Sequence, residues 1–455
     1  MTTTAADTAA GPPASAARLH ALATTGLGLF VLAQCFTLPV LAAGPSWTLW
    51  QSVPDLILWL TGACAALYLK AQGSEAQRQL WQGLLYLGAM SVLALGVLYI
   101  YDDPLLGTEL RFGAFALYRL FQVLLVFWIA SRLDYTQALL SRWHRLALLA
   151  FVVTCAGIFY TAFSGAPILF LGQHLPRGRG VSGPWEAYYL YQEAGLGFVG
   201  FNHGYAALQV MLLGALVLHL RERLDFGKRR DLTERLGRPG RRRGGGEWVL
   251  VLALAASFLC NSRAGLAGCA VFAALQLLRS PLRGALTIAG TGGLGLLLWG
   301  VLAPDLGSTT SRQATILDAT DPANLAGRTD IWQSIFSELI SDPARLLIGS
   351  GLGSATINKG NNAHNMLLQI LFETGLVGVI NVGAFFVLLL LLLSRAGPRA
   401  RAVLNVTIGF LVTSLTQETF FPNVAFGSFL PLYALVVALV LAEPTAGATR
   451  PGDPV

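Results

Sequence analysis

GLVGVINVGAFFVLLLLLLS, residues 375–394, is an apolar run without a single charged side chain. A run of this length is enough to cross the hydrocarbon core of a bilayer as one helix, which takes about 20 residues. The whole chain has the same character, because 54% of its 455 residues are hydrophobic, only 12% are charged and the mean hydropathy is +0.59. Soluble domains carry roughly 25% charged residues. The sequence therefore predicts an all-α polytopic membrane protein.

Apolar stretches of similar length recur before and after this run, and together they predict about 12 transmembrane helices. Two of them, 247–261 and 264–278, are separated only by Asn261-Ser262-Arg263. They form either a tight helical hairpin or one long run that polar residues interrupt. The other spans are expected at residues 21–43, 53–70, 79–101, 112–131, 146–164, 201–220, 284–303, 375–394, 402–418 and 425–442.

The distribution of basic residues predicts the orientation of these spans. With the N-terminus inside, most of the 31 lysine and arginine residues fall on the cytoplasmic side, as the positive-inside rule requires. The longest basic run, 221–243, is interpreted as a cytoplasmic loop and not as a nucleic-acid-binding segment, because it has no interleaved aromatic residues. Both termini are then cytoplasmic. The expected organisation is a disordered N-terminus (1–20), spans one to nine (21–303), an outer loop (304–374), spans ten to twelve (375–442) and a tail (443–455).

Two outer segments, 165–200 and 304–374, are too long to be simple connectors, and segments of this kind are usually functional or disordered. The second lies between spans nine and ten. Its apolar residues recur at helical spacing and predict a short amphipathic helix, either lying on the membrane surface or packed over the spans. These residues are Ile331, Trp332, Ile335, Phe336, Leu339 and Ile340.

The same outer loop ends in GSGLGSATINKGNNAHNMLLQILFE, residues 349–373, which holds the main candidate for chemistry. His364 opens an apolar helix there, and its imidazole can titrate near neutral pH and take a proton from a sugar hydroxyl. A histidine at the headgroup level without a chemical role is the alternative. Glu373 lies nine residues further on, on the opposite side of a helix. A carboxylate partner of His364 is therefore expected from another segment.

Three arginines are candidates for binding an anion. Arg263 lies between two spans on the outer side, where a guanidinium fits phosphate oxygens in a bidentate way; an arginine that reaches for the lipid headgroups is the alternative. Arg328 precedes Trp332 by four residues, on the same helix face, unless it only caps loop carbonyls. Arg119 lies inside the fourth span, where an ionisable residue indicates a functional role.

Further substrate-binding candidates surround these residues. Arg177 and Arg179, in the first long outer segment, are placed to gather a diphosphate, although a solvated loop would look the same. His203, near the outer end of the sixth span, lines the same cavity or is a hydrogen-bonded interhelical histidine. Lys359 and Asn365 lie close to His364 in the sequence.

No metal and no cofactor is expected. The acidic residues of the outer loop are dispersed, whereas a metal-dependent transferase gathers its oxygen ligands around the cation. The five cysteines fall within apolar runs without the spacing of metal ligands. Gly349-Ser350-Gly351-Leu352-Gly353 lacks the Lys-Ser/Thr that completes a nucleotide-binding loop, so no nucleotide is expected either.

These motifs together resemble the O-antigen ligase family and its relatives, the O-antigen polymerases and the bacterial O-linked oligosaccharyltransferases. The matching residues lie within about 247–395. They are the Arg263-Ala-Gly turn after an apolar span, Gly327-Arg328 with Trp332, Gly351-Leu-Gly353, Ala363-His364-Asn365 and Glu373-Thr-Gly375.

The resemblance implies a GT-C-like fold and transfer of a glycan from an undecaprenyl diphosphate carrier, at the periplasmic face of the bacterial inner membrane, without metal or ATP. Among these relatives, O-antigen ligase looks closest, and its acceptor would be a sugar hydroxyl of lipid A–core oligosaccharide. The positions of His364, Arg263 and Arg328 match residues regarded as essential in such proteins. A polymerase, a protein O-oligosaccharyltransferase and a transporter of lipid-linked glycans remain the alternatives.

Overall fold

The computed structural model describes residues 14–37, 39–42, 50–66, 74–101, 106–164, 197–199, 203–236, 246–278, 290, 313, 328–355, 363–420 and 429–442. These residues are nearly all helical, apart from one two-stranded antiparallel hairpin. In the first half of the chain the elements are α1 (Ala14–Ala33), β1 (Pro39–Ala42), β2 (Trp50–Ser52), α2 (Val53–Ala66), α3 (Glu75–Val97), η1 (Leu98–Ile100), α4 (Leu106–Ala130) and α5 (Gln137–Ser164). In the second half they are α7 (His203–Leu236), α8 (Glu247–Leu259), α9 (Arg263–Leu277), α12 (Arg328–Ser341), α13 (Pro343–Ile348), α15 (Met366–Arg395), η3 (Gly397–Ala400), α16 (Arg401–Thr413) and α17 (Phe429–Leu441).

Helix α7 forms the core of the bundle. The apolar window of its segment His203–Asp225 is completely buried, and α5, α8, α9, α16 and α17 all contact it. A helix that is apolar on all sides belongs in such an interior. Helices α3 and α15 are the opposite case, because only 17% and 22% of their apolar windows are buried. Their exposed apolar side chains form a surface suited to lipid.

Five of the described helices are long and apolar enough to cross a membrane, and five shorter helices are apolar as well. The chain is therefore a helical, multi-pass membrane protein, as the sequence predicts. A helix lies at each expected span except 284–303, of which the structure describes residue 290 alone. The total of 12 spans stays a prediction.

The helix bounds at the N-terminus differ from two expectations. Helix α1 already begins at Ala14, inside the segment expected to be disordered, because Ala14 and the alanines that follow it have a high helix propensity. The first span also does not run to residue 43 as one helix. It ends at Ala33, and β1 begins at Pro39, whose ring cannot continue a helix.

The two segments joined by Asn261-Ser262-Arg263 form a tight hairpin, which settles the open alternative. Helix α8 ends at Leu259 and α9 begins at Arg263. Asn261 turns the chain with a φ of 58°, and the Ser262 hydroxyl caps α9 by accepting a hydrogen bond from the Gly265 N–H at 3.1 Å. Serine and asparagine favour these positions because of their short polar side chains.

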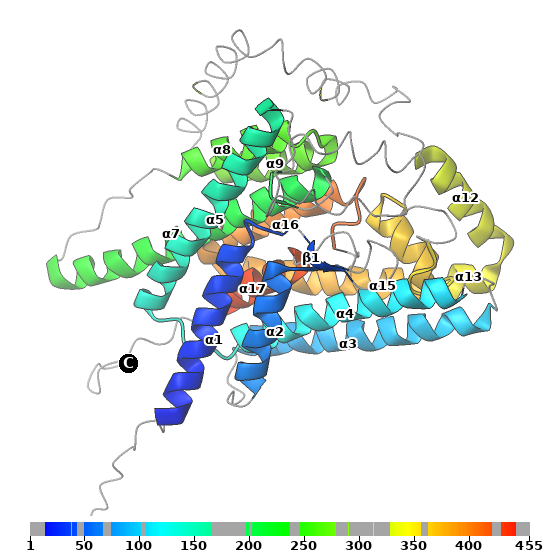
Figure 1. Cartoon of the computed structure of the whole chain (residues 1–455), viewed down its shortest axis with the longest axis horizontal. Coiled ribbons are helices and arrows are strands. Elements are labelled where there is room, and N and C mark those ends of the chain that lie inside the picture. Colours follow the sequence, from blue (N-terminus) through cyan, green and yellow to red (C-terminus); the bar gives the residue numbers. More distant parts are fainter. Residues whose placement is uncertain are drawn as a thin grey trace, which may run out of the picture.

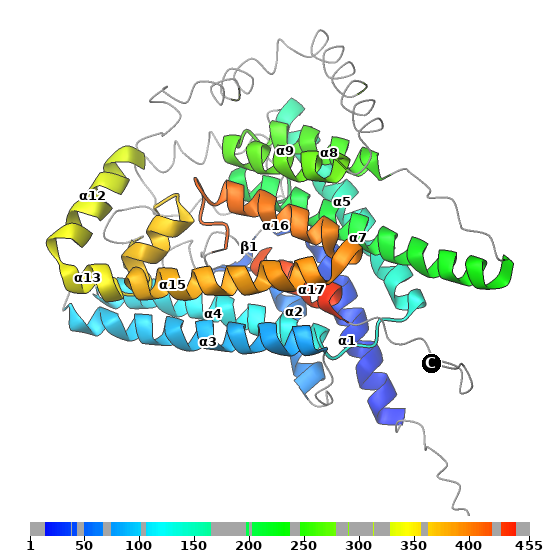
Figure 2. The ribbon, with the colours of Figure 1, turned by 180° about the vertical axis from the view of Figure 1, so that it is seen from behind.

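The predicted amphipathic helix is present as α12. Helices α12 and α13 lie across one end of α3, α4 and α15 (Figure 1), and the view from behind shows the same arrangement (Figure 2). Ile335 and Leu339 are buried against the start of α15 and its preceding loop, whereas Phe336 and Ile340 are exposed. The helix is thus packed over the ends of the spans, with part of its apolar surface left outside.

Helix α15 begins at Met366, nine residues before the expected span. It is kinked at Gly375, whose φ of 66° is not helical. A side chain is excluded there, because a Cβ atom would lie 2.3 Å from the Leu347 carbonyl oxygen. The glycine therefore separates a short first segment, 366–374, from the long apolar helix that follows.

Candidate functional site

His364 lies just before the start of α15, in a segment held by the end of α16. Its neighbour Asn365 caps α15, accepting a hydrogen bond from the Leu368 N–H at 3.0 Å, and donates one to the Leu415 carbonyl at 2.9 Å. The Met366 N–H donates to the Ser414 carbonyl at 3.0 Å. Hydrogen bonds therefore hold residues 365–366 against residues 414–415, about fifty positions further along the chain.

Glu418 supplies a carboxylate to His364. Its Oε1 atom accepts a hydrogen bond from the His364 backbone N–H and lies 3.7 Å from the imidazole Nδ1. Glu418 is 1% exposed and the His364 side chain 15% exposed, so the pair is largely shielded from water. The expectation that a partner for His364 comes from another segment, and not from Glu373, is confirmed.

Arg328 is close enough to His364 to influence its charge. Burial lowers the pKa of His364 below its usual 6.5, the Glu418 carboxylate acts against this, and the nearby Arg328 guanidinium lowers the pKa further. Trp332, one helical turn after Arg328, donates its indole N–H to the Ala363 carbonyl at 2.7 Å and so fixes α12 next to His364. The result is an imidazole that is neutral near pH 7 and able to accept a proton.

Arg263 reaches this region through the contact between α9 and α16. Gly268 and Gly409 allow the two helices to touch, since a Cβ atom on Gly268 would lie 2.6 Å from the Gly409 carbonyl oxygen. At the end of this contact, the Thr413 hydroxyl donates to the Ala264 carbonyl at 3.3 Å. Residue 413 thus holds the start of α9, and residue 414 holds the start of α15. The fold brings Arg263, Arg328 and His364 to the same end of the bundle.

Two strained positions mark the same region. Asn261, with a φ of 58°, and His364, with a φ of 50°, are the non-glycine residues with positive φ in the part of the chain that the structure describes. Asn261 is two residues before Arg263. Backbone strain of this kind persists only where the surroundings impose it, and it gathers at functional sites.

Arg119 is placed differently. It is 1% exposed, and its Nη1 atom donates to Asp55 Oδ1 at 2.7 Å and to Gln122 Oε1 at 2.9 Å. Ser52 holds the other Asp55 oxygen through its backbone N–H and its hydroxyl, both at 2.8 Å. This network joins α4 to α2 and β2, which gives Arg119 a structural task. Its role in substrate binding stays a prediction.

Of the four remaining substrate-binding candidates, the structure describes His203 alone. His203 is the first residue of α7 and is buried. Arg177, Arg179 and Lys359 lie outside the described residues. Within the described part of the chain, no group of three His, Cys, Asp or Glu side chains could hold a metal ion.

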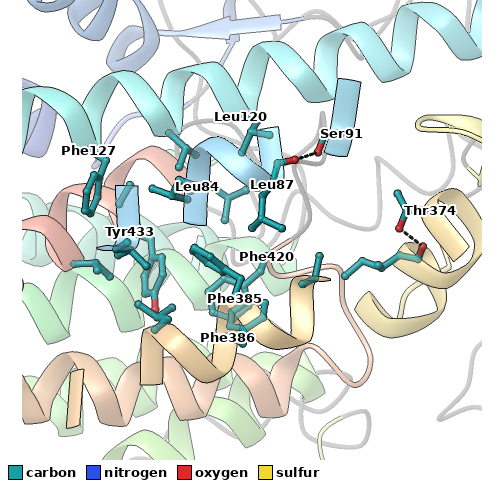
Figure 3. A pocket seen from close by; sticks show the side chains of 18 of the residues that line it. Leu84, Leu87, Ser91, Leu120, Phe127, Thr374, Phe385, Phe386, Phe420 and Tyr433 are labelled. Atoms are coloured by element: carbon teal, nitrogen blue, oxygen red, sulfur yellow. Dashed lines mark hydrogen bonds between the residues drawn. The ribbon is translucent and has the colours of Figure 1, made fainter. Parts of the chain in front are cut away.

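An apolar cavity of about 150 Å³ lies between α3, α4, α15 and α17 (Figure 3). Its few hydroxyls already have partners: Ser91 donates to the Leu87 carbonyl at 2.8 Å, Thr374 donates to the Ile370 carbonyl at 2.7 Å, and the Tyr433 hydroxyl is bonded to the Thr407 hydroxyl of α16 at 2.7 Å. The cavity therefore suits an apolar occupant. Helices α3, α4, α15 and α17 line it with Leu84, Leu87, Leu120, Phe127, Phe385, Phe386 and Tyr433, and Leu352 and Ile370 close it on the side of the 349–355 loop.

Sequence reasoning does not single out Glu418. The available signal is its position: it is the last residue of the expected span 402–418, on the outer side in the predicted orientation. A carboxyl group at the end of an apolar run indicates a paired or functional group. Which histidine or arginine it meets depends on helix packing, which the sequence pattern does not specify.

Comparison with known families agrees with this geometry. The model of the O-antigen ligase family matches residues 248–383, which include the α8–α9 hairpin, α12, α13 and the start of α15. The resemblance to that family is thereby confirmed for this part of the chain, and it supports a glycosyltransferase-like role of the ligase or polymerase type. Arg263, Arg328 and His364 all lie inside the match, whereas Glu418 lies after it. No curated protein matches the chain.

Proposed function

We propose that this protein is an O-antigen ligase. It would transfer a glycan from undecaprenyl diphosphate to a sugar hydroxyl of lipid A–core oligosaccharide, at the periplasmic face of the bacterial inner membrane. The observation that supports this most is the grouping of a neutral imidazole, His364, with the Glu418 carboxylate and the Arg328 guanidinium at one end of the apolar bundle. This end is the outer one in the orientation that the basic residues predict, with both termini cytoplasmic.

The proposed reaction is a single displacement. The acceptor hydroxyl forms a bond to the anomeric carbon while the bond from that carbon to the diphosphate oxygen breaks, so the anomeric centre inverts. Arg263 and Arg328 neutralise the charge that grows on the departing diphosphate. His364 takes the hydroxyl proton, and Glu418, on its Nδ1 side, stabilises the imidazolium that forms. No nucleotide or metal is required for these steps.

The apolar cavity fits a lipid-linked donor. Its lining of leucine and phenylalanine side chains suits a segment of an isoprenoid chain. Ile370 and Thr374 line it from the first segment of α15, which begins two residues after His364. A carrier seated there would have its diphosphate near the arginines at the outer end of the bundle.

The function is tested with the purified protein in liposomes. Carrier-linked glycan is supplied with one of three acceptors: lipid A–core, a second carrier-linked repeat unit, or an unglycosylated pilin-like protein. We expect product only with lipid A–core. Product with carrier-linked units would identify a polymerase, product with the protein acceptor an oligosaccharyltransferase, and movement of the donor across the bilayer without any transfer would identify a transporter.

The acid limb of the pH–rate profile tests the assignment of the base. Neutral His364 is the active form, so kcat/KM should be high above the pKa of His364 and fall as the pH drops through it. Because that pKa is lowered, the midpoint should lie below 6.5. Glu418→Gln keeps an oxygen for the His364 backbone N–H but removes the charge that favours imidazolium, so the midpoint should move to lower pH.

Arg328→Gln is the matched opposite change, because it removes a cation that disfavours imidazolium, and the midpoint should rise. Profiles of the wild type and both variants would be measured with the same donor and acceptor. Shifts in the same direction, or no shift in either variant, would exclude His364 as the group that the acid limb reports.

A further inference from the structure

Two side chains on the first segment of α15 lie beneath the Ala363-His364-Asn365 segment and are bonded to each other. The Gln369 amide donates from Nε2 to Glu373 Oε1 at 2.6 Å. The two residues are four apart and therefore share one face of the helix. Gln369 is 1% exposed and Glu373 is fully buried. The mechanism above uses neither residue.

This pair joins two loops. At one end, Gln369 Oε1 accepts a hydrogen bond from the Ala363 N–H at 2.8 Å, directly before His364. At the other end, Glu373 Oε2 accepts one from the Gly353 N–H at 2.8 Å. A continuous chain of hydrogen bonds thus runs from Gly353 through Glu373 and Gln369 to the backbone beside His364.

The far end of this chain is firmly seated. Gly353 has a φ of 96°, and a Cβ atom there would lie 2.5 Å from the Gly113 nitrogen of α4. The same loop is bonded to α15 by the Ser350 N–H to the Phe372 carbonyl at 2.8 Å and by the Gly351 N–H to the Glu373 carbonyl at 3.0 Å. The glycine-rich loop 349–353 therefore packs against two helices and anchors Glu373.

We propose that Glu373 and Gln369 are positioning residues that hold His364 in its strained conformation facing Glu418 and Arg328. This inference rests on the proposed function, since it assigns the residues a task in that reaction. It explains why a carboxyl group is buried in the first segment of α15, where burial of a charged group is otherwise costly. It also explains how His364 keeps a φ of 50° next to a loop.

The order of donors and acceptors calls for two accepting oxygens at position 373, which a carboxyl group supplies. Gly353 offers an N–H, and Gln369 offers its NH2 because its oxygen is used by Ala363. Both Glu373 oxygens accept, and the Ala355 N–H also bonds to this carboxyl group. An amide at position 373 has only one oxygen, so its NH2 group would face either the Gly353 N–H or the Gln369 NH2, and two hydrogen-bond donors would meet. If the Gln369 amide flipped to avoid this, its NH2 would face the Ala363 N–H, and the conflict would move next to His364.

Glu373→Gln tests the proposal. We expect kcat to fall on the order of 10²-fold, as for other small displacements of a catalytic group, while the KM for the donor changes less. A displaced His364 is also more solvated, so its pKa should rise towards 6.5. This pKa would be read directly by NMR of isotope-labelled histidine in nanodiscs, without any turnover.

The exchange variant Glu373→Gln with Gln369→Glu is the decisive comparison. The carboxylate at position 369 can accept from the Ala363 N–H and from the amide at 373, whose oxygen accepts from Gly353. The hydrogen bonds to the Ala363 N–H, between the two side chains and to the Gly353 N–H are restored with the polar groups exchanged. We expect kcat to return close to its wild-type value.

Ser354→Ala is the matched control, because the buried Ser354 hydroxyl bonds only within the same loop, to the Gly351 carbonyl at 2.7 Å. It should leave the pKa of His364 unchanged. If the exchange variant stays as impaired as Glu373→Gln, or if the pKa of His364 does not move in Glu373→Gln, the proposal is wrong. The pKa of His364 can be measured without catalysis. If the wild type transfers no glycan but the variants show the expected pKa of His364, the proposed function alone is overturned.

Discussion

Replacing His364 by asparagine should lower the rate of glycan transfer by about 10²–10⁴-fold, the usual cost of removing a well-placed general base. Asparagine is the informative choice because it tolerates the left-handed conformation that His364 adopts at a φ of 50°, whereas alanine adds backbone strain to the loss of the imidazole. The amide can still fill the space beside Glu418 but cannot take a proton from the acceptor. Initial rates with carrier-linked glycan and lipid A–core measure the effect.

The control for this variant is His144→Asn on α5, outside the proposed site, which should transfer at the wild-type rate. Donor binding, followed by quenching of tryptophan fluorescence, should be nearly unchanged in His364→Asn, because the arginines remain. A His364→Asn protein that inserts in the membrane and transfers normally would remove His364 from the mechanism.

Substitution of Arg263 has the second large effect. Arg263→Ala should lower kcat by on the order of 10²–10³-fold, as for the loss of one group that stabilises developing negative charge. Arg263→Lys should recover only a small part of this loss. Lysine keeps the charge but lacks the planar pair of donors that binds two phosphate oxygens together. Full activity of the lysine variant would show that the site needs positive potential alone.

The position of Arg263 separates this effect from a loss of stability. It is the first residue of α9, at the positive end of the helix dipole, where a cation is unfavourable. Melting temperatures of the wild type and of Arg263→Ala, measured side by side, therefore show whether folding or phosphate binding is affected. A marked fall in melting temperature would mean that the loss of activity reflects folding and not phosphate binding.

The breaks between helices could be predicted where the signal is local. Asn261-Ser262-Arg263 interrupts two apolar runs, and the structure has a hairpin there because asparagine accepts a positive φ and serine caps the next helix. The end of α1 was harder to place. The apolar run continues past Ala33 to residue 43, and hydropathy does not distinguish a helix from the short strand that begins at Pro39.

The candidate site could be predicted only in part. His364, Arg263 and Arg328 stand out because charged and titratable residues are rare in a chain of this composition and these three lie at or near the starts of helices. Glu418 and Gln369 do not stand out, since each gains its importance from one contact: a carboxylate at the imidazole, and an amide at the Ala363 N–H. The pairing of Arg119 with Asp55 is of the same kind, as 64 positions separate the two residues.

Hydropathy and the placement of charge were enough to establish a multi-pass helical protein and to direct attention to the segment 304–374, because the bilayer imposes its thickness on every span. Which side chains meet near the end of that segment depended on how closely α9 and α16 approach at Gly268 and Gly409, and on a kink at Gly375 that turns the start of α15. Such contacts join residues far apart in the chain. They arise from side-chain shape and packing, which no periodicity in a single sequence encodes.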